Sequence, residues 1–349
     1  MNRADPILER AVMVASALLG VEVESVERIR HGGRNSRIFR VRAGSESFAL
    51  KQYPTRQDDP QDRLKAEADA LRLMERHHIH AVPRAIGIDR ERGFLLLTWI
   101  DGSPVDVVNE EDVEVADRFL TAVHALRYER EAERLPPAAE ACLSGAEIEH
   151  QIRARLLRLD ERRRSEAELV GFLDGSFVPL LDRVLVGVRS RMSAVGLAYD
   201  SPLPHNRRSL IPADFGFHNS LRRPDGGLAF LDFEYFGWDD PVKLTADFLL
   251  HPGMTLNPAA RGRFRLAAER RYADDAGFGA RLDALYVLFG LRWVLVLLNE
   301  FLPERWEERV KAGFGADWSE AKRRQLARAA ELLDRMSNEA EGVVHSNER

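Results

Sequence analysis

The chain is short of cysteine, of excess positive charge and of long apolar runs, and each shortage excludes a class of protein. Cys142 is the single cysteine among 349 residues, which excludes an internal disulfide and a cysteine metal cluster and fits a reducing compartment. Lys and Arg number 51 against 56 Asp and Glu, a net charge of −5, whereas nucleic-acid-binding surfaces usually show a basic excess. No run approaches the roughly 20 apolar residues that a membrane span needs. We therefore expect a cytoplasmic protein whose partner is neither nucleic acid nor a membrane.

The first part of the chain, up to about Ile100, alternates short strand-like runs with turns. An apolar stretch from Ala11 to Val21 precedes them, and its acidic neighbours Asp5 and Glu9 favour an amphipathic helix over a signal peptide. This order predicts a small, β-rich α+β lobe over residues 1–100. The strands are expected at residues 26–30, 36–42, 46–53 and 94–100, with one helix at residues 63–77.

Helical spacing dominates the remainder of the chain. Helices are expected at residues 112–126, 145–160 and 165–192, and further helices continue to about residue 336. Two short apolar runs, at residues 210–211 and 228–233, are joined through RRPDGG at residues 222–227, which is typical of a hairpin turn. We expect a larger, mainly helical lobe over residues 101–336. The polar tail at residues 337–349 is expected to be frayed.

The strongest chemical signal lies on both sides of this turn, in the segments PADFGFHNSL and FLDFEYFGWDDP. Asp214 and Asn219 lie in the first segment, and Asp232 follows at the end of the next apolar run. Phosphoryl transfer needs a carboxylate beside the attacking hydroxyl and oxygen ligands that hold Mg²⁺ against the phosphates of ATP. Mg²⁺ prefers such hard oxygen donors and usually takes one or two carboxylates from the protein. Because Asp and Asn are also common in turns, it is the ordered set that indicates this chemistry.

These segments resemble the catalytic and metal-binding loops of the aminoglycoside phosphotransferase and choline kinase superfamily, which is related to the protein kinases. The resemblance implies a two-lobed, protein-kinase-like α+β fold and the cofactors ATP and Mg²⁺. It also implies that Asp214 is the catalytic base, Asn219 a metal ligand and Asp232 the main metal ligand. Pro212 stands where the family usually has a histidine, which generally acts as a structural brace.

Residues of the N-terminal lobe fit the nucleotide-binding parts of the same family. Lys51 at the end of the run FALK and Glu67 in the following helix fit the ion pair that holds the ATP phosphates. The backbone from Thr98 to Ile100 fits the hinge that holds adenine. The turn whose N–H groups would cover the phosphates contains Gly32, Gly33, Asn35 and Ser36. Taken singly, these features also describe a surface ion pair, a core strand and an ordinary hairpin turn.

Acidic and aromatic residues near the metal motif indicate where the acceptor would bind. Glu234 and Asp239 would attract an amine, and the aromatic residues between them would hold a quaternary ammonium group. His218, next to Asn219, would line the same site. The alternative for all three is a structural role, with the acidic residues bracing the catalytic loop and His218 packing beside it.

Together these features predict an enzyme that transfers the γ-phosphate of ATP, with Mg²⁺, to a hydroxyl of an amino-sugar, a sugar or an amino alcohol. The run DFEY resembles the choline kinase form of the motif, so a choline or ethanolamine kinase proper is an alternative. A pseudokinase that binds nucleotide without transfer is a second alternative, which Pro212 favours and the intact charged set opposes. A protein kinase is disfavoured, because the motif reads DFE rather than DFG and no APE-type segment follows.

Overall fold

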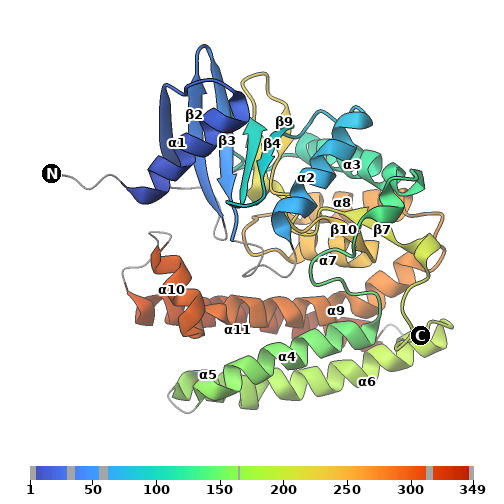
Figure 1. The fold of residues 1–349 in the computed structure, drawn as a ribbon. Helices are drawn as coiled ribbons and strands as arrows, with labels where there is room; N and C mark the ends of the chain where they lie inside the picture. Colours follow the sequence, from blue (N-terminus) through green and yellow to red (C-terminus); the bar gives the residue numbers. More distant parts are fainter. Residues whose placement is uncertain (1–4, 30–35, 55–61, 164–165, 312–316, 346–349) are drawn as a thin grey trace. The chain divides into compact units, whose positions relative to one another are not determined.

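The structure is a computed structural model that describes residues 5–29, 36–54, 62–163, 166–311 and 317–345. The chain divides into two compact units, both drawn in Figure 1. The first unit consists of residues 1–140, 209–238 and 253–264, and the second of residues 141–208, 239–252 and 265–349. The first unit therefore contains both the segments predicted to bind ATP and those predicted to carry catalysis, which the sequence assigns to different lobes.

The first unit begins with one helix and five strands: α1 (Pro6–Leu19), β1 (Ser25–Ile29), β2 (Arg37–Ala43), β3 (Glu46–Gln52), β4 (Ala85–Asp89) and β5 (Phe94–Thr98). The strands form one antiparallel sheet in the order β1-β2-β3-β5-β4. Helix α1 packs on one face of this sheet, where Ala11 and Val14 join a core that includes Phe39 and Leu50. Figure 1 shows α1 lying across these strands.

Helix α2 (Arg63–Arg76) lies against the other face of the sheet. Successive strand residues point to opposite faces, so Leu50 of β3 belongs to the α1 core while Lys51 points toward α2. Asp62 caps the N-terminus of the helix, because its carboxylate accepts a hydrogen bond of 3.2 Å from the Lys65 N–H. The alternation of β3 thus places a lysine beside the first turns of α2.

The rest of the first unit includes α3 (Glu110–Ala125) and the short strands β6 (Ser103–Pro104), β7 (Ser209–Ile211), β8 (Ser220–Arg222), β9 (Leu228–Phe230) and β10 (Gly237–Asp239), of which β10 ends at the first residue of the second unit. Strands β6, β8 and β9 form one small sheet, and β7 pairs with β10. The ring of Phe119 in α3 lies 5.5 Å from that of Phe215, 4.5 Å from that of Phe230 and 6.1 Å from that of Phe233. This aromatic cluster supports both the segment after β7 and the segment after β9.

The second unit is helical, with α4 (Gly145–Arg163), α5 (Ala167–Phe172), α6 (Val178–Ala194), α7 (Pro241–Leu250), α9 (Phe278–Leu297), α10 (Pro303–Lys311) and α11 (Trp318–His345). Helix α8 (Pro258–Arg271) begins in the first unit and ends in the second. Helix α9 is central, because α4, α6, α7 and α11 all pack against it. The predicted α+β class is therefore confirmed, with the sheet and the helices concentrated in different parts of the chain.

Among the residues that the structure describes, one stretch, Phe278–Phe301, is long and apolar enough to cross a membrane by length and composition. The prediction that no run approaches this length is wrong by that measure. Most of the stretch is buried inside the second unit, as in the core helix of a soluble protein. Its cations are paired there: Arg281 donates to Asp240 at 3.0 Å, and Arg292 donates to Gln151 at 2.8 Å.

Several elements differ from the sequence predictions; for example, the helix expected at residues 165–192 is divided into α5 and α6 by a π-helical turn at Leu173–Phe177. The sequence does not predict β4, where Gly87 interrupts the alternation and the pairing with β5 shifts register. The turn at residues 222–227 joins β8 to β9, whereas the sequence suggests a hairpin between the runs at residues 210–211 and 228–233. The strand β8 is not evident from the sequence, because it is short and only partly apolar. Helix α11 continues to His345, beyond the expected fraying after residue 336, and Ala340 packs against the core of the second unit.

Candidate functional site

The loop between β7 and β8 holds Asp214 in a defined position. The Asn219 side-chain amide donates to the Asp214 backbone oxygen at 2.9 Å and lies 3.4 Å from its Oδ2. The His218 Nε2 lies 3.2 Å from Oδ1 of the same carboxylate. The Asp214 side chain is 38% exposed, so the carboxylate is held by two neighbours and remains open to solvent. The predicted residues Asp214, Asn219 and His218 thus lie together.

Close backbone packing shapes this loop. A Cβ atom at Gly216 would lie 2.6 Å from the Met254 sulfur and 2.7 Å from the His218 Nδ1, so a larger residue would force these side chains to shift. The Phe217 N–H donates to that same sulfur at 3.1 Å. Ala213 has a φ of +50°, a left-handed conformation that costs a non-glycine residue free energy and is concentrated at functional sites. The strained residue lies directly before Asp214, where a catalytic side chain would need fixing.

Asp232 lies just after β9, and its loop is bound to the first one. The Leu231 N–H donates to the Asn219 backbone oxygen at 2.9 Å, which joins the two loops. Asp232 has a φ of +69°, a second left-handed residue, and Asp is among the residue types that tolerate this conformation. Its side chain is 26% exposed. The carboxylate is therefore placed near the first loop and is partly open.

Lys51 stands at the centre of a cluster of three carboxylates. Its ammonium group lies 2.6 Å from Glu67, 2.5 Å from Asp232 and 3.1 Å from Glu234. Burial by itself would lower the pKa of Lys51, but the neighbouring carboxylates, Asp232 first, raise that pKa well above its ordinary value. The lysine is thus a fixed positive charge, and the predicted Lys51–Glu67 pair is formed.

Glu234 belongs to the cluster of charged residues around Lys51. Its side chain is buried between Lys51 and Arg63, whose guanidinium is 3.4 Å from the second carboxylate oxygen. Burial raises the pKa of Glu234, and the charge of Lys51 opposes the rise. This placement favours the structural alternative for Glu234, because its two carboxylate oxygens face the cations of Lys51 and Arg63. Arg63 is a further residue of this cluster that the sequence could have indicated, since it precedes Glu67 by one helical turn and so shares its face.

The carboxylates around Lys51 also fit a divalent cation. Glu67, Asp232 and Glu234 each offer an oxygen, and these atoms lie within 4.8 Å of one another. Hard carboxylate oxygens with one partly open member are the donors that Mg²⁺ takes. Glu67 and Glu234 are buried against Lys51, so of these three carboxylates Asp232, whose side chain is 26% exposed, is the one left open to the predicted metal.

Part of the predicted nucleotide site can be compared with the structure. Gly32, Gly33 and Asn35 lie outside the described residues, and Ser36 directly precedes β2. Thr98 ends β5, and its N–H donates to the Arg84 backbone oxygen at 3.0 Å. An adenine contact at Thr98 would thus use the carbonyl oxygen, and the predicted contact through the Ile100 backbone stays a prediction.

Asp239 belongs to the second unit and is completely buried. Its Oδ1 accepts hydrogen bonds of 2.8 Å from the backbone N–H groups of Cys142 and Asp240, and Lys243 lies 3.7 Å from Oδ2. Burial raises the pKa of Asp239 to about 7, while Lys243 and the two N–H groups oppose the rise. A carboxylate enclosed in this way braces the start of α7, which argues against the predicted acceptor contact.

This burial predicts a pH dependence of stability. Below about pH 4 the Asp239 carboxyl is protonated in the folded and the unfolded chain; as the pH rises toward 7 the unfolded chain loses the proton first. The group therefore favours the folded state at low pH and loses this contribution through about pH 7. We expect Asp239→Asn, which keeps an oxygen for the two N–H groups, to gain stability relative to wild type between pH 4 and 7. Chemical denaturation at each pH measures this; a constant difference would contradict it.

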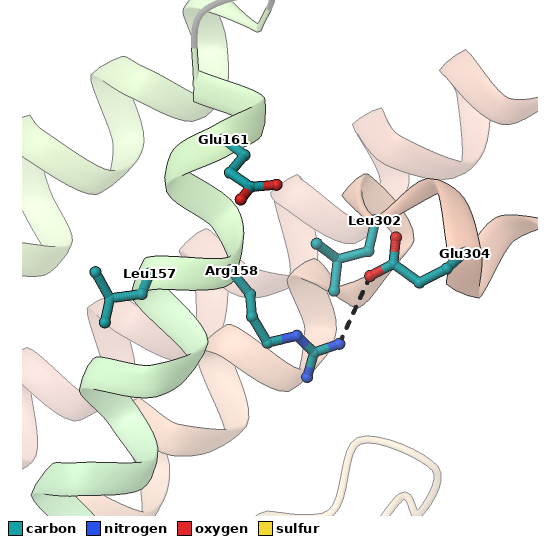
Figure 2. Close-up of a pocket in the computed structure, with 5 residues that line it drawn as sticks. All are labelled: Leu157, Arg158, Glu161, Leu302 and Glu304. Carbon is teal, nitrogen blue, oxygen red and sulfur yellow. Dashed lines mark ion pairs between the residues drawn. The ribbon is translucent and has the colours of Figure 1, made fainter. Parts of the chain in front are cut away.

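The second unit contains a cavity, drawn in Figure 2, that is lined by none of the predicted site residues. It has a volume of about 320 Å³ and is lined by Leu157, Arg158, Glu161, Leu302 and Glu304. Arg158 and Glu304 form an ion pair of 3.8 Å across it, with both side chains about half exposed. Exposed ion pairs of this kind contribute little and hold no group in a fixed position, so the cavity is not the candidate active site.

Comparisons with known proteins agree with this geometry. A model described as "Phosphotransferase enzyme family" matches residues 25–275. Choline kinase LicA from Streptococcus pneumoniae is similar in structure, with a TM-score of 0.59, 16% identity, and coverage of 95% of this chain and 99% of that chain. A spectinomycin phosphotransferase in complex with ADP and spectinomycin gives a TM-score of 0.58 at 10% identity, covering 94% of this chain and 98% of that chain. A Plasmodium vivax ethanolamine kinase gives 0.54 at 14% identity, covering 88% and 83%. None of the curated proteins matches the chain in sequence.

Proposed function

The chain belongs to the phosphotransferase enzyme family, and from this membership we propose that it transfers the γ-phosphate of ATP, with Mg²⁺, to a hydroxyl of a small molecule. The observation that carries the proposal is the contact of the Lys51 ammonium with Glu67 at 2.6 Å and with Asp232 at 2.5 Å. A lysine for phosphates and a carboxylate for the metal are thereby fixed together in the unit that also holds Asp214. Solved structures of the same fold include one bound to ADP, which supports a nucleotide as the phosphate donor.

Each residue has a role in this reaction. Asp214 orients the acceptor hydroxyl and takes its proton at the carboxylate, while Asn219 holds the loop and offers a metal ligand. Lys51 binds the ATP phosphates, and Glu67 keeps its ammonium in place. Bound to Asp232 and Asn219, Mg²⁺ would neutralise charge that develops on the phosphates.

The acceptor we propose is an amino-sugar, a sugar or an amino alcohol. The support for this proposal is that the chain shares its fold with kinases of choline, ethanolamine and spectinomycin. The acceptors of those kinases range from an amino alcohol to a ring compound. Because Glu234 and Asp239 are enclosed by other residues, neither is carried forward as an acceptor contact. His218, beside the Asp214 carboxylate and only partly buried, is the one predicted acceptor residue that keeps this role.

The test is Mg²⁺- and ATP-dependent ADP release in the presence of aminoglycosides, amino-sugars, free sugars, choline, ethanolamine and homoserine. ATP binding is measured on the same samples by calorimetry. We expect one acceptor class to stimulate ADP release above the rate without acceptor. Binding of ATP without stimulation by any acceptor would favour a pseudokinase, and no binding at all would overturn the proposal.

A further inference from the structure

The carboxylate of Glu67 accepts hydrogen bonds from other groups besides its partner Lys51. Its Oε2 accepts from Lys51 and also from the Tyr53 hydroxyl, while its Oε1 lies 3.3 Å from the Phe233 N–H. Tyr53 is 3% exposed and Glu67 is 1% exposed. A buried carboxylate costs free energy unless its oxygens are paired, so each of these donors stabilises the charged form in this place.

The sheet itself places Tyr53 beside Lys51. Residues two apart in an extended chain point to the same face, and Tyr53 follows Lys51 at that spacing just after β3 ends. The Tyr53 N–H donates to the Gly93 carbonyl at 2.8 Å. Gly93 has a φ of +73°, and a Cβ atom added to it would lie 2.9 Å from the Tyr53 backbone carbonyl oxygen. The turn before β5 therefore needs this glycine in order to hold the Tyr53 backbone closely.

Tyr53 contacts both members of the ion pair. The Lys51 ammonium lies 4.9 Å from the centre of the Tyr53 ring, within the range of a cation–π interaction. The hydroxyl of the same ring donates to Glu67. One rigid side chain thus limits where the ammonium and the carboxylate can go, whereas Lys51 and Glu67 alone would have several side-chain rotamers.

We propose that Tyr53 is a positioning residue for nucleotide binding, whose hydroxyl holds Glu67 in the rotamer that keeps Lys51 directed at the phosphate site. This inference rests on the proposed function, since it needs Lys51 to bind phosphate. It assigns Tyr53 no contact with ATP or acceptor. The hydroxyl acts through Glu67, and the ring acts on Lys51.

The test is Tyr53→Phe, which keeps the ring and removes the hydroxyl. We expect the dissociation constant of Mg·ATP and the KM for ATP to rise about tenfold, as for loss of a hydrogen bond to a charged group, with kcat changed less than threefold. The matched control is Tyr199→Phe in the second unit, which removes a hydrogen bond of 2.9 Å to Glu149 from a ring that also lies 3.9 Å from an arginine. The control should bind ATP as wild type does.

A cycle with Glu67→Ala separates positioning from a general loss of folding. If the hydroxyl acts through Glu67, adding Y53F to E67A changes ATP affinity no further, whereas an independent structural effect would add to it. All variants are measured well below their unfolding temperatures. Wild-type affinity in Y53F, or full additivity with E67A, overturns the inference. Wild-type protein that binds no ATP overturns the proposed function instead, so the two failures are distinguishable.

Discussion

Asp214→Asn should abolish phosphate transfer and leave Mg·ATP binding unchanged. The amide has the size of the carboxylate and keeps an oxygen for the contact with Asn219, but it cannot accept the proton of the acceptor hydroxyl. Loss of a positioned general base typically lowers kcat by about 10²–10⁴-fold. Asn219 still donates to the Asp214 backbone oxygen at 2.9 Å and the replaced side chain is 38% exposed, so the fold should be unaffected. The measurements are kcat with the stimulating acceptor and ATP affinity by calorimetry.

The matched control for this change is Asp225→Asn, in the turn between β8 and β9. Asp225 accepts a hydrogen bond of 3.0 Å from the Gly227 N–H, and this exposed turn lies in the same unit. D225N should keep wild-type kcat. If D214N retained more than about a tenth of the wild-type rate, Asp214 would not be the base; if it lost ATP binding as well, the loop would serve binding rather than proton transfer.

The sequence predicts the charged centre of the site because each member belongs to a short local motif. Lys51 ends a strand, Glu67 lies in the next helix, and Asp232 follows an apolar run, so spacing and residue type identify them. The structure brings these three within direct contact, as their order predicts. The family of the chain is confirmed by the match over residues 25–275.

The other partners of these charged residues could not be predicted in the same way. Tyr53 and Arg63 are ordinary residues in the sequence, and only the approach of α2 to β3 and to the segment after β9 gives them Glu67 and Glu234 as partners. Glu234 follows Asp232 closely, and sequence alone does not tell whether it faces a phosphate or an acceptor. Its direction depends on the backbone at Asp232, whose φ of +69° turns the chain.

Asp232→Ala should remove the Mg²⁺ dependence of ATP binding. We expect affinity in Mg²⁺ to fall more than about tenfold, since one of the few protein ligands of a reluctantly dehydrated cation is lost. The fold should persist, because Lys51 keeps Glu67 at 2.6 Å and Glu234 at 3.1 Å, so no buried charge is left unpaired.

Without Mg²⁺ the expected effect of D232A has the opposite sign. In the wild-type protein the Asp232 carboxylate lies 2.5 Å from the Lys51 ammonium and would repel the phosphates of free ATP. Removing it frees Lys51 for the nucleotide, so D232A should bind ATP in EDTA more tightly than wild type does. Calorimetric titrations with and without Mg²⁺ should therefore cross. Equal losses of ATP affinity in both buffers would show that Asp232 only supports the fold. No loss of affinity in either buffer would place the metal on other residues. Only the crossing shows that Asp232 is a metal ligand that also competes with ATP for Lys51.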